Sequence, residues 1–202
     1  MTELSSKTEK KILNAAEEVF IREGMSGARM QEIANQAGIN KALLHYYYRT
    51  KERLFMAVFQ KAASQIIPDI QDVLIADMPL FDKIPIIVDK YTRLLLKKPF
   101  LPLFILHEIS RKPDQLAQII QAQGIKPELI QQQISKEIEA GIIKPVNPMD
   151  LVINILSLVI FPVAAKPMLQ RILFSNDKKA YKEFLKSRNE EVPKFIINAI
   201  KK

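Results

Sequence analysis

The spacing of apolar residues predicts a chain built almost entirely of helices. Over most of the 202 residues apolar side chains recur at intervals of three and four, and valine-rich runs of alternating apolar and polar positions are few. Glycine occurs only five times, and Leu, Ile, Lys, Glu and Gln are abundant, which favours helix over strand. We therefore expect an all-α fold whose helices are separated by prolines and glycines. The expected helices cover residues 8–23, 30–37, 41–47, 51–67, 69–76, 81–97, 100–110, 114–123, 127–140, 148–174 with a bend near Pro162 and a second candidate break near Pro167, and 177–201 with a kink at Pro193.

Two short helices joined by a tight turn are expected near the N-terminus. The apolar positions of residues 30–37 fall on one helix face, and Gly38 follows where a left-handed residue can end that helix. Asn40 can then accept the free amide hydrogens of a second helix, residues 41–47, whose Leu44 can face inward. This arrangement is typical of a helix-turn-helix, in which the second helix enters the major groove of DNA.

A longer stretch around these helices resembles a known family. Within residues 10–59 the apolar helix ILNAAEEVF is followed in order by Gly24, IANQAGI, an L-x-x-Y-Y that closes the second helix, and TKERL. In order and spacing this resembles the N-terminal DNA-binding domain of the tetracycline-repressor (TetR) family of bacterial regulators. The rest of the chain matches the family only in length, helical character and position. The resemblance implies a three-helix DNA-binding domain over residues 1–50 and a larger helical domain over residues 51–202 that binds an effector and dimerises.

The resemblance also implies which side chains meet double-stranded operator DNA. Carried over residue by residue, they are Arg29, Gln31, Lys41, Ala42, Leu43, His45, Tyr46, Tyr47 and Lys51. Tyr46 and Tyr47 are expected on the phosphate backbone, and Ala42 close to thymine methyl groups. Lys51 stands at the start of a helix, where its charge and the free amide hydrogens both favour a phosphate. His45 occupies a position where many family members carry a tyrosine, so this chain departs from the pattern there.

The charge of the chain suits a polyanionic partner without locating its binding site. The formal net charge is +8 and the isoelectric point is about 9.5, which fits nucleic acid or an anionic membrane surface. Acidic residues offset many of the lysines in residues 1–55, and residues 178–188 are at least as basic. The alternative to a DNA-binding regulator is therefore a basic helical lipid carrier or membrane-surface protein without specific DNA binding.

Missing residue types argue against other classes of protein. Cysteine is absent, so a disulfide, a thiolate nucleophile and a zinc knuckle are excluded. His107 and Glu108 begin an H-E-x-x-H pattern, but Arg111 takes the place of the second histidine. A glycine-rich phosphate loop and a G-x-S-x-G motif are also absent. We expect no enzymatic activity, no metal and no cofactor.

The chain lacks the patterns of secretion and membrane insertion. Residues 1–11 contain no apolar core of a signal peptide. The apolar run over residues 151–165 is interrupted by Asn154, Ser157 and Pro162, and it is shorter than the roughly 20 residues that span a bilayer. We expect a cytoplasmic protein with no membrane partner, in which this run is a helix buried against protein.

The larger domain is expected to pair two copies of the chain. One helix-turn-helix reads too few base pairs, so a homodimer would place two of them on half-sites roughly 34 Å, or a multiple of that, apart. The helix at residues 149–161 is apolar nearly all round, which is unusual for the surface of a monomer. We predict that it joins the last helix and their twofold mates in a four-helix bundle; the alternative is burial within its own domain. The predicted interface residues are Met149, Val152, Ile153, Leu156 and Ile160.

Aromatic, thioether and imidazole side chains of the larger domain form a candidate effector pocket. They are Tyr91, Leu95, Phe100, Phe104, His107, Phe161 and Met168. Such groups commonly line a site for a small apolar or aromatic ligand. The alternative is ordinary core packing for the aromatic residues and a hydrogen bond to a carbonyl for His107. The resemblance implies a repressor that releases its operator when an effector enters this domain.

Overall fold

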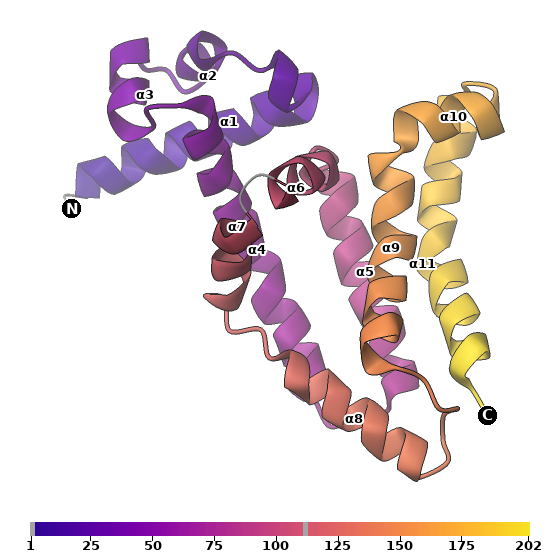
Figure 1. The fold of residues 1–202 in the computed structure, drawn as a ribbon. Helices are drawn as coiled ribbons and strands as arrows, with labels where there is room; N and C mark the ends of the chain where they lie inside the picture. The colour runs from indigo at the N-terminus through magenta and orange to yellow at the C-terminus, as the bar shows by residue number, and fades with distance from the viewer. Residues whose placement is uncertain (1–2, 111–112) are drawn as a thin grey trace.

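A small N-terminal head sits on a larger helical body (Figure 1). The computed structural model describes residues 3–110 and 113–202, without the side chains of residues 3–5, 104, 107 and 108. Its helices are α1 (Glu3–Gly27), α2 (Met30–Gln36), α3 (Lys41–Tyr47), α4 (Lys51–Ile75), α5 (Leu80–Lys97), α6 (Leu101–Ile109), α7 (Pro113–Gln121), α8 (Pro127–Glu139), α9 (Pro148–Ala164), α10 (Lys166–Phe174) and α11 (Lys178–Ile200). Within the described ranges the extended backbone pairs only in one isolated bridge, between Ile143 and Lys201. The predicted all-α fold is confirmed.

The head forms because α1, α2, α3 and the first half of α4 bury a common apolar core. Phe20 of α1, Leu44 of α3 and Phe55 of α4 are fully buried in it. Gly24 has a φ of 67°, which breaks α1 where the sequence predicted the helix to end. Phe100, which follows α5, packs its ring edge-on to Phe55 at a centroid distance of 5.4 Å. The head is therefore fixed to the body by direct apolar packing.

The fourth helix links head and body without a break. The sequence predicted an interruption at Pro68, and this prediction was wrong because α4 runs from Lys51 to Ile75. Pro68 is exposed, whereas Ile67 and Val73 on either side of it are buried. Packing before and after the proline outweighs the lost backbone hydrogen bond and the steric cost, which together amount to about 3 kcal/mol. A displacement at the far end of α4 can therefore reach the head.

The body is organised around α5, which packs against α4, α9 and α11. In Figure 1, α8 crosses the end of the body furthest from the head, and α9 and α11 run side by side along one edge. Leu80, Ile84 and Val88 of α5 share a second apolar core with Tyr181 and Val192 of α11. This second core is separate from the core of the head.

The long helix expected over residues 148–174 is divided in two. Pro162 lies inside α9, and the break comes at Ala165, after which α10 turns away by 78°. Pro167 occupies the first turn of α10, a position where a missing amide hydrogen costs little. Pro193, like Pro162, lies inside a helix, in this case α11.

Candidate nucleic-acid interface

The outward face of α3 is available because the helix is capped at its start and anchored from behind. The side-chain oxygen of Asn40 accepts a hydrogen bond from the Leu43 amide at 2.7 Å. Leu44 is fully buried in the core of the head. Gly38, with a φ of 67°, makes the tight turn from α2. These three features fix the orientation of α3 in the head.

Four of the predicted contact residues project from α3 into solvent. Lys41, Ala42 and Leu43 are exposed in its first turn, and Tyr46 is 82% exposed. Tyr47 is half-buried, and its ring meets that of Tyr46 edge-on at a centroid distance of 5.6 Å. Tyr46 is therefore open to a partner, and Tyr47 supports it from the side of the head.

The other predicted residues of α2 and α3 are partly engaged within the head. Arg29 and Gln31, at the start of α2, are exposed, and the Gln31 amide donates to Asn35 Oδ1 at 2.9 Å. His45 is half-buried, with Nδ1 3.1 Å from the carbonyl oxygen of Arg49. The imidazole is thus directed at the loop after α3.

Lys51 holds the loop between α1 and α2. Its ammonium group donates to the carbonyl oxygens of Ala28 at 3.0 Å and Ser26 at 3.4 Å. An ammonium group has three hydrogens, so one remains for another acceptor. These two hydrogen bonds join Lys51 to residues more than twenty positions away, and nothing in the local sequence indicates them.

Two exposed cations beside this surface were not among the predicted residues. Arg49 follows α3, and Arg53 lies in the first turn of α4. The Thr50 hydroxyl between them accepts a hydrogen bond from the Arg53 amide at 3.2 Å, which caps α4. A basic residue at every second position, Arg49, Lys51 and Arg53, was the pattern that could have identified them.

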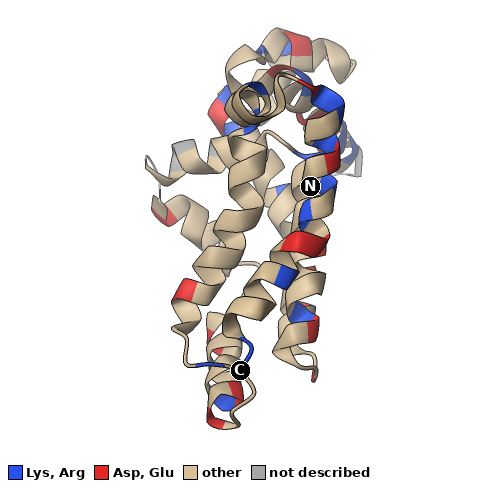
Figure 2. Ribbon diagram, turned by 90° about the vertical axis from the view of Figure 1, so that its right-hand side faces the viewer, with Lys and Arg blue, Asp and Glu red and all other residues tan. Residues whose placement is uncertain are grey.

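Charge alone does not distinguish the head from the body. In Figure 2, Lys and Arg occur in both regions and are interspersed with Asp and Glu. Within the head, α3 differs from α1, α2 and α4 in that it carries no acidic residue.

A carboxylate of α1 ties the head to the body. Glu17 Oε1 lies 2.9 Å from Nζ of Lys98, which is buried at the end of α5, and Glu17 Oε2 lies 3.3 Å from Nζ of Lys61 on α4. Lys61 also donates to Asn14 of α1 at 2.8 Å. Burial by itself would raise the pKa of Glu17, but the hydrogen bonds and charges of Lys98 and Lys61 bring that pKa below its usual value. Glu17 is therefore ionised at neutral pH and connects three helices.

An apolar cavity of about 220 Å³ lies inside the body between α4, α5, α8 and α9. Its wall consists of apolar side-chain surface, to which Leu74 of α4, Ile84 and Ile87 of α5, Ile130 of α8 and Val152 of α9 all contribute. These aliphatic residues were not predicted as pocket residues. Isoleucine and leucine at helical spacing are indistinguishable in the sequence from ordinary core residues.

Among the residues predicted for an effector pocket, those whose side chains are described are not brought together. Tyr91 lines the cavity, and burial raises the pKa of its phenol to about 12. Leu95 is buried in the core of the body, and Phe100 packs in the core of the head.

Two more residues of that set are exposed at the surface. Phe161 of α9 and Met168 of α10 are 56% and 51% exposed. The side chains of Phe104 and His107 lie outside the described residues.

Helix α9 has an inward and an outward apolar face. Met149, Val152 and Leu156, three of the predicted dimer residues, line the cavity. Ile153 is 59% exposed, and Ile160 packs half-buried against the core of the body. The apolar residues all round α9 therefore have two different environments: some line the cavity and others are exposed on the surface.

Exposed large apolar side chains also occur on α10 and α11, which pack against α9. Large apolar side chains that are more than half exposed include Phe161 of α9, Ile172 and Leu173 of α10, and Phe195 of α11. Asn154 of α9 and Phe195 border the same groove between α9 and α11. The two helices thus share this groove.

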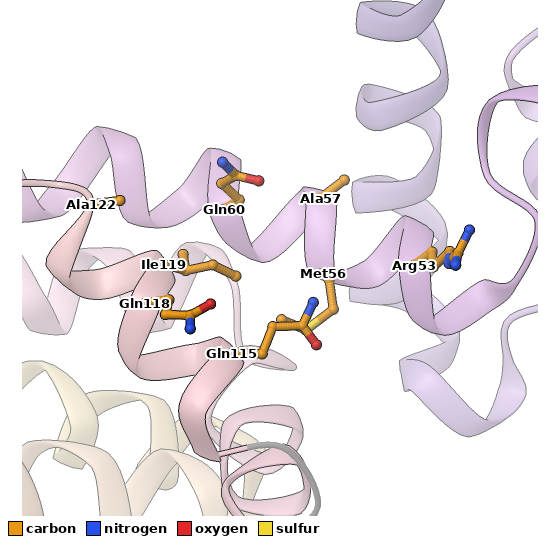
Figure 3. A pocket seen from close by; sticks show the side chains of 8 residues that line it. All are labelled: Arg53, Met56, Ala57, Gln60, Gln115, Gln118, Ile119 and Ala122. Atoms are coloured by element: carbon orange, nitrogen blue, oxygen red, sulfur yellow. The ribbon is translucent and has the colours of Figure 1, made fainter.

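A second hollow, of about 410 Å³, lies between α4 and α7 (Figure 3). Gln60 of α4 and Gln115 and Gln118 of α7 line it, together with Arg53 and Met56. The three amide groups add polar atoms to a wall that is otherwise largely apolar, and the hollow is open to solvent. It therefore cannot bury an apolar molecule as the cavity in the body can.

Neither a membrane span nor a metal cluster is found in the described part of the chain. No single helix there is long and apolar enough to cross a membrane, although α9 and α10 together meet that test as a bent pair. No group of three or more His, Asp or Glu side chains among the described residues is placed to hold a metal ion.

Comparison with known sequences finds relatives of the head. Residues 12–58 match the family described as bacterial regulatory proteins, tetR family. The HTH-type transcriptional repressor NicS of Pseudomonas putida is 31% identical over 96 residues, which are 44% of each chain. The HTH-type transcriptional regulator RutR of Escherichia coli is 41% identical over 56 residues, 28% of this chain and 26% of RutR. The match thus spans less than half the length of these curated relatives.

Comparison with solved structures covers the whole chain. A TetR-family transcriptional regulator from Mesorhizobium loti has a TM-score of 0.64 at 20% identity and covers 100% of both chains. The regulator FadR of Bacillus subtilis, solved in complex with stearoyl-CoA, has a TM-score of 0.60 at 19% identity and covers 90% of this chain and 97% of its own. At these identities the similarity establishes the fold. The comparisons give no support to the alternative of a lipid carrier.

Proposed function

We propose that the chain is a sequence-specific DNA-binding transcription regulator and not an enzyme, since its residues 12–58 match the tetR family of bacterial regulatory proteins. The observation that carries the proposal is the exposed face of α3. There Lys41, Leu43 and Tyr46 project from a helix that is capped by Asn40 and anchored by Leu44. Such a regulator acts on DNA in the cytoplasm.

In the proposed complex α3 lies in the major groove of the operator. Lys41 reaches a phosphate or a base edge, and Tyr46 hydrogen-bonds to the backbone. Ala42 allows a close approach to thymine methyl groups. Arg29 and Gln31 extend the contact from α2, where both are exposed.

The other carried-over residues act from behind this surface. Tyr47 supports the ring of Tyr46, and His45 faces the loop that follows α3. Lys51 holds the loop before α2 with two ammonium hydrogens and offers the third to a phosphate.

The regulator acts as a homodimer, because two heads are needed to read two half-sites. The outward apolar face of α9, α10 and α11 is the surface that the second copy covers. Ile153, Phe161 and Phe195 are more than half exposed there, and large apolar side chains rarely gather in this way on a monomer.

Release from DNA follows when an effector enters the body. The cavity is lined by Leu74 near the end of α4, and the opposite end of α4 belongs to the core of the head. A ligand that binds more tightly to one conformation of the body increases the population of that conformation. In that conformation the two heads no longer match the spacing of the operator half-sites. The direction of control, repression in the absence of ligand, follows the family resemblance.

The test is fluorescence anisotropy of the full chain with DNA from upstream of its own gene and with a scrambled duplex, at two salt concentrations. We expect preferential binding to the upstream duplex that weakens as salt rises. Lys41→Ala should weaken binding by about tenfold and reduce the salt slope by about one. Lys136→Ala removes the same charge from the exposed surface of α8 and should leave binding unchanged.

Lys41→Ala is preferred to Lys51→Ala because Lys51 also holds the head together. If the upstream duplex fails, selection from genomic fragments extends the search to all sites of the source genome. Failure of the protein to enrich any fragment over scrambled DNA would overturn the proposal.

A further inference from the structure

The wall of the cavity in the body contains no group that could meet a charge. Its residues are aliphatic except for Pro127, Met149 and Tyr91, and only apolar atoms of these side chains face the interior. A carboxylate, phosphate or ammonium group placed there would lose its water without gaining a partner, which costs several kcal/mol. The part of a ligand that enters this cavity must be uncharged.

The buried cation of α5, Lys83, forms its hydrogen bonds outside the cavity. Lys83 is 2% exposed and donates to the carbonyl oxygen of Leu74 at 2.7 Å and to Gln133 Oε1 at 2.6 Å. The amide of Gln133 in turn donates to Glu137 Oε1 at 2.8 Å, so a buried carboxylate is part of the same network. Lys83 is not among the residues that line the cavity, so it offers no positive charge to an anionic ligand there.

The cavity follows the length of α5 and is not confined to a single helical turn. Leu80, Ile84, Ile87 and Tyr91 line it from one face of the helix, and they span about 16 Å at the rise of an α-helix. An elongated space between antiparallel helices fits an extended chain better than a compact ring system.

The volume sets the size of that chain. An apolar cavity of about 150 Å³ holds one benzene molecule, so the volume of about 220 Å³ here corresponds to about nine carbon atoms. Pro127 and Ile130 of α8 and Val152 of α9 close the space on the side opposite α5.

We propose that this cavity binds the hydrocarbon chain of an uncharged aliphatic molecule of medium length, about eight to ten carbons. The inference deepens the proposed function by naming the chemical class of the effector. Only the role of the bound molecule as an effector rests on that function. Binding itself depends on the cavity alone and can be measured without DNA.

The experiment is isothermal titration of the full chain at pH 8 with three probes: 1-octanol, octanoate and 1-adamantanol. We expect 1-octanol to bind with a negative heat-capacity change. Octanoate has the same chain with a charged end, and 1-adamantanol has a similar carbon count in a compact cage; each should bind at least about tenfold more weakly. Equal or tighter binding of octanoate, or no binding of 1-octanol, would overturn the proposal.

A pair of variants localises the binding. Ile87→Trp places an indole in the cavity and should reduce the affinity for 1-octanol by at least about tenfold. Ile86→Trp makes the same change at the next position of α5, which borders a different hollow against α4, and should leave the affinity unchanged. If Ile87→Trp fails to fold, as judged by circular dichroism, Val152→Phe fills the cavity from α9. Unchanged affinity in the folded filling variant would place the ligand elsewhere and overturn the assignment.

The outcomes for ligand and operator are distinguishable. Binding of 1-octanol by a protein that has no preferred DNA fragment would sustain this inference and overturn the proposed function. Operator binding without any uptake of 1-octanol would do the reverse.

Discussion

The orientation of α3 depends most directly on the hydrogen bond that the Asn40 side chain accepts. It satisfies the Leu43 amide at 2.7 Å, so the first turn that carries Lys41 and Ala42 is closed before any DNA is present. The other end of α3 is held by Tyr48, whose hydroxyl donates to Glu9 of α1 at 3.0 Å. Single polar contacts at both ends therefore fix a helix of only seven residues.

Replacing the cap should loosen the recognition helix. Asn40→Ala leaves the Leu43 amide without its partner and should lower the free energy of unfolding by about 1 kcal/mol, measured by urea denaturation. Operator affinity should fall as well, because a frayed first turn must be ordered again on binding. Asn40→Ser keeps an oxygen at the cap and should restore most of both losses. Equal behaviour of the two variants would show that capping is not the cause.

Among the elements, α1 joins the head to the rest of the molecule. Its Glu17 is shared between Lys61 of α4 and Lys98 at the end of α5, while Phe20 packs against Phe55 at a centroid distance of 4.6 Å. The ion pairs are largely buried, so removing one partner leaves the others without compensation.

The Glu17 contacts should make stability depend on pH. Since the folded-state pKa of Glu17 lies below its usual value of 4.5, ionised Glu17 stabilises the fold at neutral pH. That contribution is lost as the pH falls from 4.5 through the folded-state pKa. Glu17→Gln should therefore cost about 2 kcal/mol at pH 7, and the difference from the parent protein should shrink below pH 4.5.

Urea denaturation across this pH range is the measurement. Glu139→Gln removes an exposed carboxylate of α8 and should change stability little at any pH. A constant difference between Glu17→Gln and the parent down to low pH would contradict an ionic origin.

At the scale of the whole molecule, α9 lies between the cavity in the body and the exposed apolar surface. Its inward side chains, such as Val152, close the cavity, and its outward ones, such as Ile153, face solvent next to the groove shared with α11. The proposed ligand site and the proposed dimer interface therefore lie on opposite sides of one helix. A ligand that shifts α9 would also change the distance between the two heads.

A charge on the outward face should separate the two copies. Ile153→Glu places a carboxylate in the proposed interface, and light scattering at micromolar concentration should then report a monomer with weakened operator binding. Ile75→Glu is the matched control, since Ile75 is 60% exposed and Ile153 is 59% exposed. A parent protein that is itself monomeric, or an Ile153→Glu variant that remains a dimer, would rule out this surface as the interface.

The sequence by itself determined the head. Gly38 and Asn40 act on their immediate neighbours, and the apolar spacing of α2 and α3 sets which face is buried, so all of these signals lie within a few residues of the structure they specify. The all-α class followed for the same reason, because helical periodicity is a local property. Lys41 and Tyr46 of α3 were named from the family resemblance, and both are exposed while Leu44 is buried.

Only the tertiary structure decided what the body does with its apolar residues. Isoleucines 84, 87 and 153 have the same chemistry, yet two face a cavity and one faces solvent, since the difference lies in which helix stands opposite. Packing on both sides kept α4 continuous through Pro68, and distant carbonyl oxygens gave Lys51 a structural role. Such outcomes depend on contacts between segments far apart in the chain, which local spacing does not encode.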